Sequence, residues 1–117
     1  MDRAERTLYL LPVWLGAEGG GDLLPAQNVQ VVKKTMLYFA ENEKSARAIL
    51  RRMVPGIALP ELEIHRLDER TSDEELKDFI ALMRERDGVV ISEAGMPCIA
   101  DPGAKLVELA HRSGIRV

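Results

Sequence analysis

The chain has 117 residues, which is room for one domain of ordinary size but not for two. Its composition, 46% hydrophobic and 30% charged, is typical of a globular protein and argues against disordered, collagen-like and membrane-spanning classes. With 16 basic and 19 acidic residues the net charge is −3, so an RNA partner would have to meet a local basic patch. One cysteine and two histidines leave no disulfide framework and little material for a metal centre, so we expect no metal.

The amino-terminal segment does not have the pattern of a targeting signal. The apolar run at residues 8–15 is about half as long as a membrane-spanning helix, and Pro12 interrupts it. No small-residue cleavage pattern follows this run. Because a single cysteine, Cys98, also suits a reducing compartment, we expect a cytoplasmic protein whose first strand starts almost at once.

The first half of the chain alternates strand patterns with helix patterns. Residues 7–11 are a run of β-formers that ends at a proline, as a buried strand does. After a glycine-rich loop we expect a short helix at residues 25–33 and a second strand at residues 36–40. A helix is predicted over residues 43–53, because its apolar residues recur at helical spacing: Ala46, Ile49, Leu50 and Met53.

The alternation continues beyond a loop marked by prolines. Residues 62–67 predict a third strand with an exposed rim. Ser72 and Glu75 have the spacing of a capping box, which begins a helix. Residues 89–91 predict a short buried strand. The buried stripe of the helix before that strand is predicted to contain Leu76, Phe79, Ile80 and Met83.

The end of the chain completes the predicted fold. Asp101 is expected to cap a last helix with Pro102 at its first position, and Gly114 ends that helix. Residues 115–117 would begin a fifth strand. The chain is therefore predicted to be an α/β domain with a mostly parallel five-stranded sheet and helices on both faces. Because such proteins seldom stop inside a buried strand, we expect residues 1–117 to be the first domain of a longer protein.

Ligands of such a sheet bind beyond the carboxyl ends of its strands, where three loops are expected: residues 12–21, 41–44 and 92–103. The last of these contains Gly95-x-Pro97 and then Asp101-Pro102-Gly103. Two rigid turns in tandem expose backbone N–H and C=O groups in fixed directions, as a cleft for a polar ligand requires. The alternative is a tight turn followed by a capped helix.

The glycine-rich first loop could also suggest a dinucleotide site, because Glu41 follows it by about 20 residues, where a ribose-binding acid would lie. However, the glycines at positions 16, 19, 20 and 21 do not have the G-x-G-x-x-G spacing. The chain also lacks a G-x-x-x-x-G-K-[ST] phosphate-binding loop. The sequence thus gives little support to dinucleotide binding.

The run ISEAGMPCIADPG at residues 91–103, followed by Leu106-Val107, resembles the signature of the tetrapyrrole methylase superfamily. Within that superfamily it is most similar to the branch that 2′-O-methylates a cytidine ribose in small-subunit ribosomal RNA. The segments LYLLPVWLG at residues 8–16 and FAENEK at residues 39–44 are similar to further motifs of this branch. The resemblance extends in register from about residue 7 to residue 117 and so covers nearly the whole chain.

This resemblance implies an S-adenosylmethionine-dependent methyltransferase of two α/β domains, usually a homodimer, with the cofactor in the cleft between the domains. Only the first domain is present here, so the chain alone is expected to be inactive. By position, the residues that match cofactor contacts of such enzymes are Leu15, Gly95, Met96, Pro97 and Ile99.

A ribose hydroxyl is a poor nucleophile near neutral pH, so its methylation would benefit from a positioned base. The candidates are Glu41 and Glu93, which follow the second and fourth predicted strands. Lys44 and Arg47, on one face of the helix at residues 43–53, are candidates for contacts with RNA phosphates. The alternative is that all four are solvated surface charges.

Two other functions are compatible with the same fold. One is a C-methyltransferase of tetrapyrroles (uroporphyrin or corrin precursors), which would share the cofactor site. The other is a module that retains the fold, has lost catalysis and binds a partner.

Overall fold

The computed structural model describes residues 6–12, 26–92 and 101–117. Its helices and strands begin within one residue of the predicted positions. In chain order they are β1 (Leu8–Pro12), α1 (Ala26–Lys34), β2 (Leu37–Ala40), α2 (Glu43–Met53), the 3-10 helix η2 (Leu59–Glu61), β3 (Glu63–Arg66), α3 (Asp73–Met83), β4 (Gly88–Ser92) and α4 (Asp101–Arg112). The 3-10 helix was not expected, and it lies in the predicted proline-rich loop.

The four strands form one sheet with the order β1-β4-β2-β3, and every pair in it is parallel. The expected parallel sheet is therefore confirmed, but the prediction of five strands is wrong for the part of the chain that the structure describes. Residues 115–117 form only one bridge, between Thr7 and Arg116. Two backbone hydrogen bonds hold Arg116 beside β1, and a single bridged residue does not make a strand.

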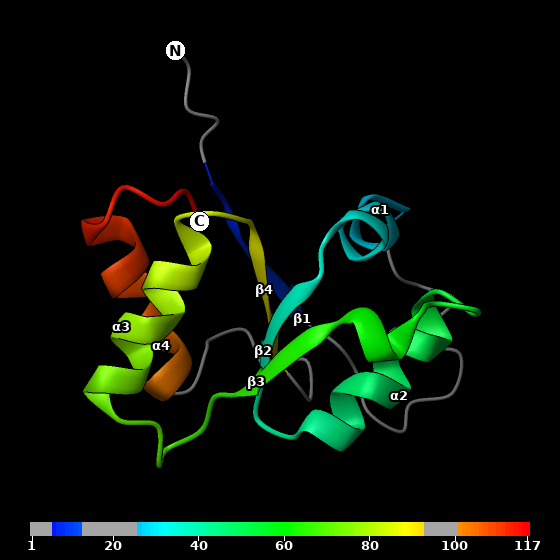
Figure 1. Ribbon diagram of the computed structural model, residues 1–117, viewed down its shortest axis with the longest axis horizontal. Coiled ribbons are helices and arrows are strands. Elements are labelled where there is room, and N and C mark those ends of the chain that lie inside the picture. Colours follow the sequence, from blue (N-terminus) through cyan, green and yellow to red (C-terminus); the bar gives the residue numbers. More distant parts are fainter. Residues whose placement is uncertain (1–5, 13–25, 93–100) are drawn as a thin grey trace.

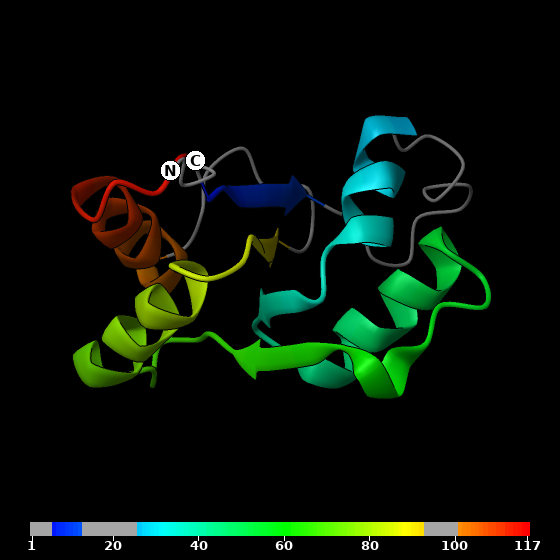
Figure 2. The same ribbon diagram turned by 45° about the horizontal axis from the view of Figure 1, so that its top comes forward.

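Helices cover both faces of the sheet, as predicted. Figures 1 and 2 show α1 and α2 on one face and α3 and α4 on the other. Successive residues of β2 alternate between the two layers, as the period of a strand requires. Tyr38 and Ala40 pack with the buried residues of α2, whereas Leu37 and Phe39 pack with those of α3 and α4.

The two central helices begin where the sequence predicts, and each start has a physical cause. At α2 the side chain of Asn42 accepts a hydrogen bond of 2.9 Å from the backbone N–H of Ser45. At α3 the predicted capping box is complete, since Ser72 and Glu75 each bond the backbone N–H of the other. Both helices therefore start at defined points just beyond the carboxyl ends of β2 and β3.

The chain after β2 turns to one face of the sheet, whereas the chain after β3 turns to the opposite face (Figure 1). β2 and β3 are neighbours in the sheet. Adjacent parallel strands whose connections diverge in this way leave a crevice between their carboxyl ends, where open α/β sheets bind ligands.

Candidate functional site

The structure describes three of the nine predicted site residues: Glu41, Lys44 and Arg47. It brings all three together on one pocket. The other six lie outside the described residues, and their predicted roles stay predictions: Leu15, Glu93, Gly95, Met96, Pro97 and Ile99.

The pocket lies in the crevice between β2 and β3 and has a volume of about 470 Å³. Three stretches that are distant in the sequence contribute to it, namely the start of α2, the end of β3 and the first turns of α3. Its lining residues are Glu41, Asn42, Glu43, Lys44, Arg47, His65, Arg66, Glu75 and Phe79. We call this pocket the α2–α3 crevice. Its volume falls in the range of small-molecule sites, about 300–1,000 Å³.

His65 is a residue of the crevice that the sequence analysis missed. Its ring stacks on Phe39, with centroids 5.9 Å apart and planes inclined by 25°, and it lies 5.2 Å from the ring of Phe79. Both phenylalanines are buried and pack on each other at 4.7 Å. The imidazole is thus the partly exposed end of an aromatic cluster, and one third of its side chain reaches solvent.

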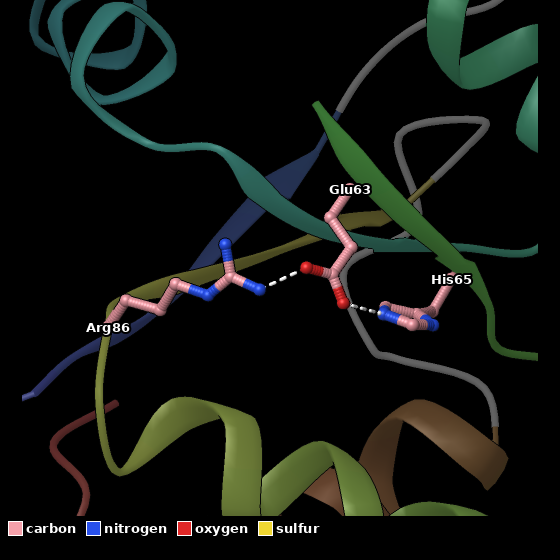
Figure 3. Close-up of polar contacts among 3 residues, drawn as sticks. All are labelled: Glu63, His65 and Arg86. Carbon is pink, nitrogen blue, oxygen red and sulfur yellow. Dashed lines mark hydrogen bonds and ion pairs between the residues drawn. The ribbon is translucent and has the colours of Figure 1, made fainter. Parts of the chain in front are cut away.

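Glu63 holds the imidazole from the same strand (Figure 3). Its Oε2 lies 2.6 Å from Nε2 of His65, and its Oε1 accepts a hydrogen bond from Arg86. The hydrogen bond from His65 lowers the pKa of the Glu63 carboxyl; Arg86 lowers it further, and partial burial opposes both. The carboxylate is therefore ionised at neutral pH. Spacing could have revealed this pair, because residues two apart on a strand share a face.

Some charged side chains of the crevice already have a partner within the chain, and others do not. Arg66 forms an ion pair of 3.2 Å with Asp68, and the Glu75 carboxylate accepts the N-cap N–H of α3. Lys44 and Arg47 are exposed and, among the described residues, have no ion-pair partner. These two cations are available to an anionic ligand.

The carboxyl ends of β1 and β4 are the points after which the predicted cofactor-binding segments begin. The last residues of β1 and β4, Pro12 and Ser92, are partners in the parallel register. The chain therefore leaves the sheet at adjacent points toward residues 13–25 and residues 93–100.

Two further observations concern the described residues alone. They contain no group of three or more His, Cys, Asp and Glu side chains that could bind a metal ion. None of their helices combines the length and the apolar character needed to cross a membrane.

No protein-family profile matches the chain. It is 33% identical to the ribosomal RNA small subunit methyltransferase I of Thermotoga maritima over 90 residues, which are 76% of this chain and 38% of the relative. The protein of the same name from Xylella fastidiosa is 33% identical over 111 residues, 95% of this chain and 38% of the relative. That from Streptococcus pyogenes serotype M6 is 32% identical over 112 residues, 95% and 36% respectively. The chain thus spans little more than a third of these curated relatives.

Proposed function

We propose, from the distant homology of this chain to ribosomal RNA small subunit methyltransferase I, that it forms part of an S-adenosylmethionine-dependent methyltransferase of small-subunit ribosomal RNA. The reaction is the methylation of a ribose 2′-hydroxyl. The observation that carries the proposal is 33% identity maintained over 95% of the chain. The names of these relatives favour RNA over the tetrapyrrole alternative.

The cofactor supplies an electrophilic methyl group, and the residues proposed to hold it are Leu15, Gly95, Met96, Pro97 and Ile99. The parallel pairing of β1 with β4 supports this proposal, because both loops start at one edge of the sheet. Ligands of open α/β sheets bind at that edge. Transfer of a methyl group from a sulfonium disperses charge, so alignment of the reactants supplies much of the catalysis.

The RNA is proposed to lie across the carboxyl edge toward α2, where Lys44 and Arg47 contact its phosphates. The absence of ion-pair partners for these cations in the described part of the chain supports this role. Glu41 lies on the same crevice and is proposed as the base that receives the proton of the ribose hydroxyl, with Glu93 as the second candidate.

The test is calorimetric titration of S-adenosylhomocysteine into the product of the complete reading frame, with the 117-residue chain measured in parallel. We expect the complete product to bind it and the 117-residue chain to bind weakly or not at all, because the cofactor cleft is proposed to lie between this domain and a second one. Labelled S-adenosylmethionine should then transfer its methyl group to small ribosomal subunits that lack the modification. A folded complete product that binds no S-adenosylhomocysteine would refute the proposal and favour a non-catalytic module.

A further inference from the structure

We propose that the α2–α3 crevice binds one nucleotide of a single-stranded RNA, and that Nδ1 of His65 accepts a hydrogen bond from the ribose 2′-hydroxyl of that nucleotide. The inference rests on the proposed function in one respect, since it takes RNA as the ligand. It adds a binding site and a residue that distinguishes RNA from DNA. The 2′-hydroxyl is the group by which a protein makes that distinction.

The hydrogen-bonding pattern of His65 determines what the ring offers. The Glu63 carboxylate is ionised and can only accept, so Nε2 of His65 must carry the proton that lies between them. In a neutral imidazole with its proton on Nε2, Nδ1 has a free lone pair. Figure 3 shows this second nitrogen on the side of the ring away from Glu63. In that form the ring presents an acceptor to the donor of a ribose hydroxyl.

The imidazole is also held in place before any ligand arrives. Phe39 and Phe79 restrict the plane of the ring, and Arg86 holds the carboxylate that orients it. A group fixed by packing and by a supporting hydrogen bond loses little freedom on binding.

The crevice offers two cations for phosphates and a volume in the range of small ligands, beside the carboxylates of Glu41, Glu43 and Glu75. Lys44 and Arg47 lie on the same crevice as His65 and are free to meet phosphates. Contacts with phosphates are independent of the sugar, so these two side chains should bind RNA and DNA alike. At this nucleotide the selectivity for ribose would come from His65, whereas Glu41 is proposed to act on the ribose of the nucleotide that is methylated.

The inference can be tested with a fluorescently labelled single-stranded RNA of about ten nucleotides and a DNA of matching sequence, whose binding is followed by anisotropy. The variant His65→Phe keeps a ring between Phe39 and Phe79 but removes both nitrogens. We expect it to bind the RNA about three- to tenfold more weakly, the effect of one hydrogen bond, with its affinity for the DNA unchanged. The matched control is His111→Phe, at an exposed position of α4, which should alter neither affinity.

Two results would overturn the inference and leave the proposed function standing: an equal affinity of the wild-type protein for both oligonucleotides, or a preference for RNA that survives in His65→Phe. Failure to bind S-adenosylhomocysteine or any RNA would instead refute the proposed function. The ring nitrogens of His65, observed by two-bond proton–nitrogen NMR in the wild-type protein, give a readout that needs no variant. We expect an unprotonated Nδ1 whose resonance shifts with RNA and not with DNA. A proton on Nδ1, with or without one on Nε2, would contradict the inference.

Discussion

The carboxyl edge of the sheet has two parts that are built in different ways. At β1 and β4, the segments proposed to bind the cofactor follow the strands directly and are contiguous in the sequence, as in residues 91–103. At β2 and β3, the α2–α3 crevice collects side chains from three separate stretches: the start of α2, the end of β3 and the first turns of α3.

The difference shows which kind of site a sequence motif can reveal. A loop of glycines and prolines that presents backbone groups has a local signature, so a resemblance to a family can be recognised there. A crevice made of side chains has no such signature, because only the fold brings its residues together. The first part is thus the more recognisable, and the second is where binding of a particular substrate can vary.

The largest expected effect comes from the loss of the Phe39 ring, which belongs to the core and also packs on His65 of the α2–α3 crevice. Phe39→Ala removes a fully buried ring beneath His65 and should lower the free energy of unfolding by about 3–5 kcal/mol, measured by urea denaturation. It should also abolish the preference for RNA under conditions where the variant is folded. Leu106→Ala, at a fully buried position of α4, should lower the free energy of unfolding by about 2–5 kcal/mol and keep that preference. If both variants lost the preference for RNA over DNA, the preference would depend on overall stability and not on the crevice.

The next effect concerns the proposed cofactor part of the edge. The double variant Gly95→Val with Pro97→Ala should weaken binding of S-adenosylhomocysteine by about a hundredfold, or ~2.7 kcal/mol, because a bulky side chain blocks close approach to the backbone. Its melting temperature should change little, and its affinity for RNA should stay near that of the wild type. If the variant lost affinity for S-adenosylhomocysteine and stability equally, or lost stability alone, the proposed role of these residues in cofactor binding would be contradicted.

Lys44 and Arg47 have no ion-pair partner among the described residues, and reversal of their charges should affect only binding at the crevice. Lys44→Glu with Arg47→Glu should weaken binding of single-stranded RNA about tenfold or more and flatten its salt dependence by about 0.7 in log–log slope for each phosphate that the variant no longer neutralises. Affinity for the DNA should fall in parallel. A control with equal change in charge is Lys77→Glu with Lys105→Glu, at exposed positions of α3 and α4 outside the crevice lining. If the salt dependence of RNA binding were unchanged, α2 would not contact the RNA phosphates.

A smaller effect is expected at the start of α3, which carries Glu75 and Phe79 into the crevice. Ser72→Ala leaves the N–H of Glu75 without its side-chain partner and should lower the free energy of unfolding by about 1 kcal/mol. Ser113→Ala, just beyond α4, is the control, and it should change the free energy of unfolding by less than about 0.5 kcal/mol. An unchanged stability of Ser72→Ala would mean that the cap does not hold this wall of the crevice.

The smallest effect should appear at Glu63. Its pKa is lowered in the folded protein, so its contribution to stability is present above the ordinary value of 4.5 and is lost as the pH falls through the lowered value. Wild type should therefore exceed Glu63→Gln in urea midpoint at about pH 7, and the difference should shrink in acid. Glu69→Gln, at an exposed turn position, is the control and should show no such trend. A difference that stays constant from about pH 7 to about pH 3 would contradict the assignment.

Much of the fold could be predicted because the two central strands, β2 and β4, are buried on both faces. β1, β2 and β4 are short apolar runs, and the capping box of α3, Ser72 with Glu75, has the expected spacing. The sheet has four strands rather than five in the described part of the chain, since residues 115–117 form a single bridge. The 3-10 helix η2 was missed because Pro60 signals a turn and gives no indication of the turn's type.

The site could be predicted only in part. Glu41 follows a strand directly, as the rule for open sheets requires, whereas Lys44 and Arg47 were selected as cations on one face of the next helix. His65 lies within β3, on a segment that was expected only to have an exposed rim. Its importance depends on Glu63, Arg86 and Phe79, and the last two come from other parts of the chain. Sequence patterns do not contain contacts of this kind.

The strand order also constrains the order in which the protein can assemble. β1 is made first, yet its only strand partner among the described residues is β4, and the bond from the backbone N–H of Thr7 to Asp87 spans 80 residues. Until β4 leaves the ribosome, Leu8 and Leu11 have no sheet in which to be buried. β2, α2 and β3 can form their contacts earlier, because they are adjacent in sequence. The nascent chain must therefore carry an unpaired apolar strand until residues 88–92 have been made, which is the stage at which a holding chaperone would act.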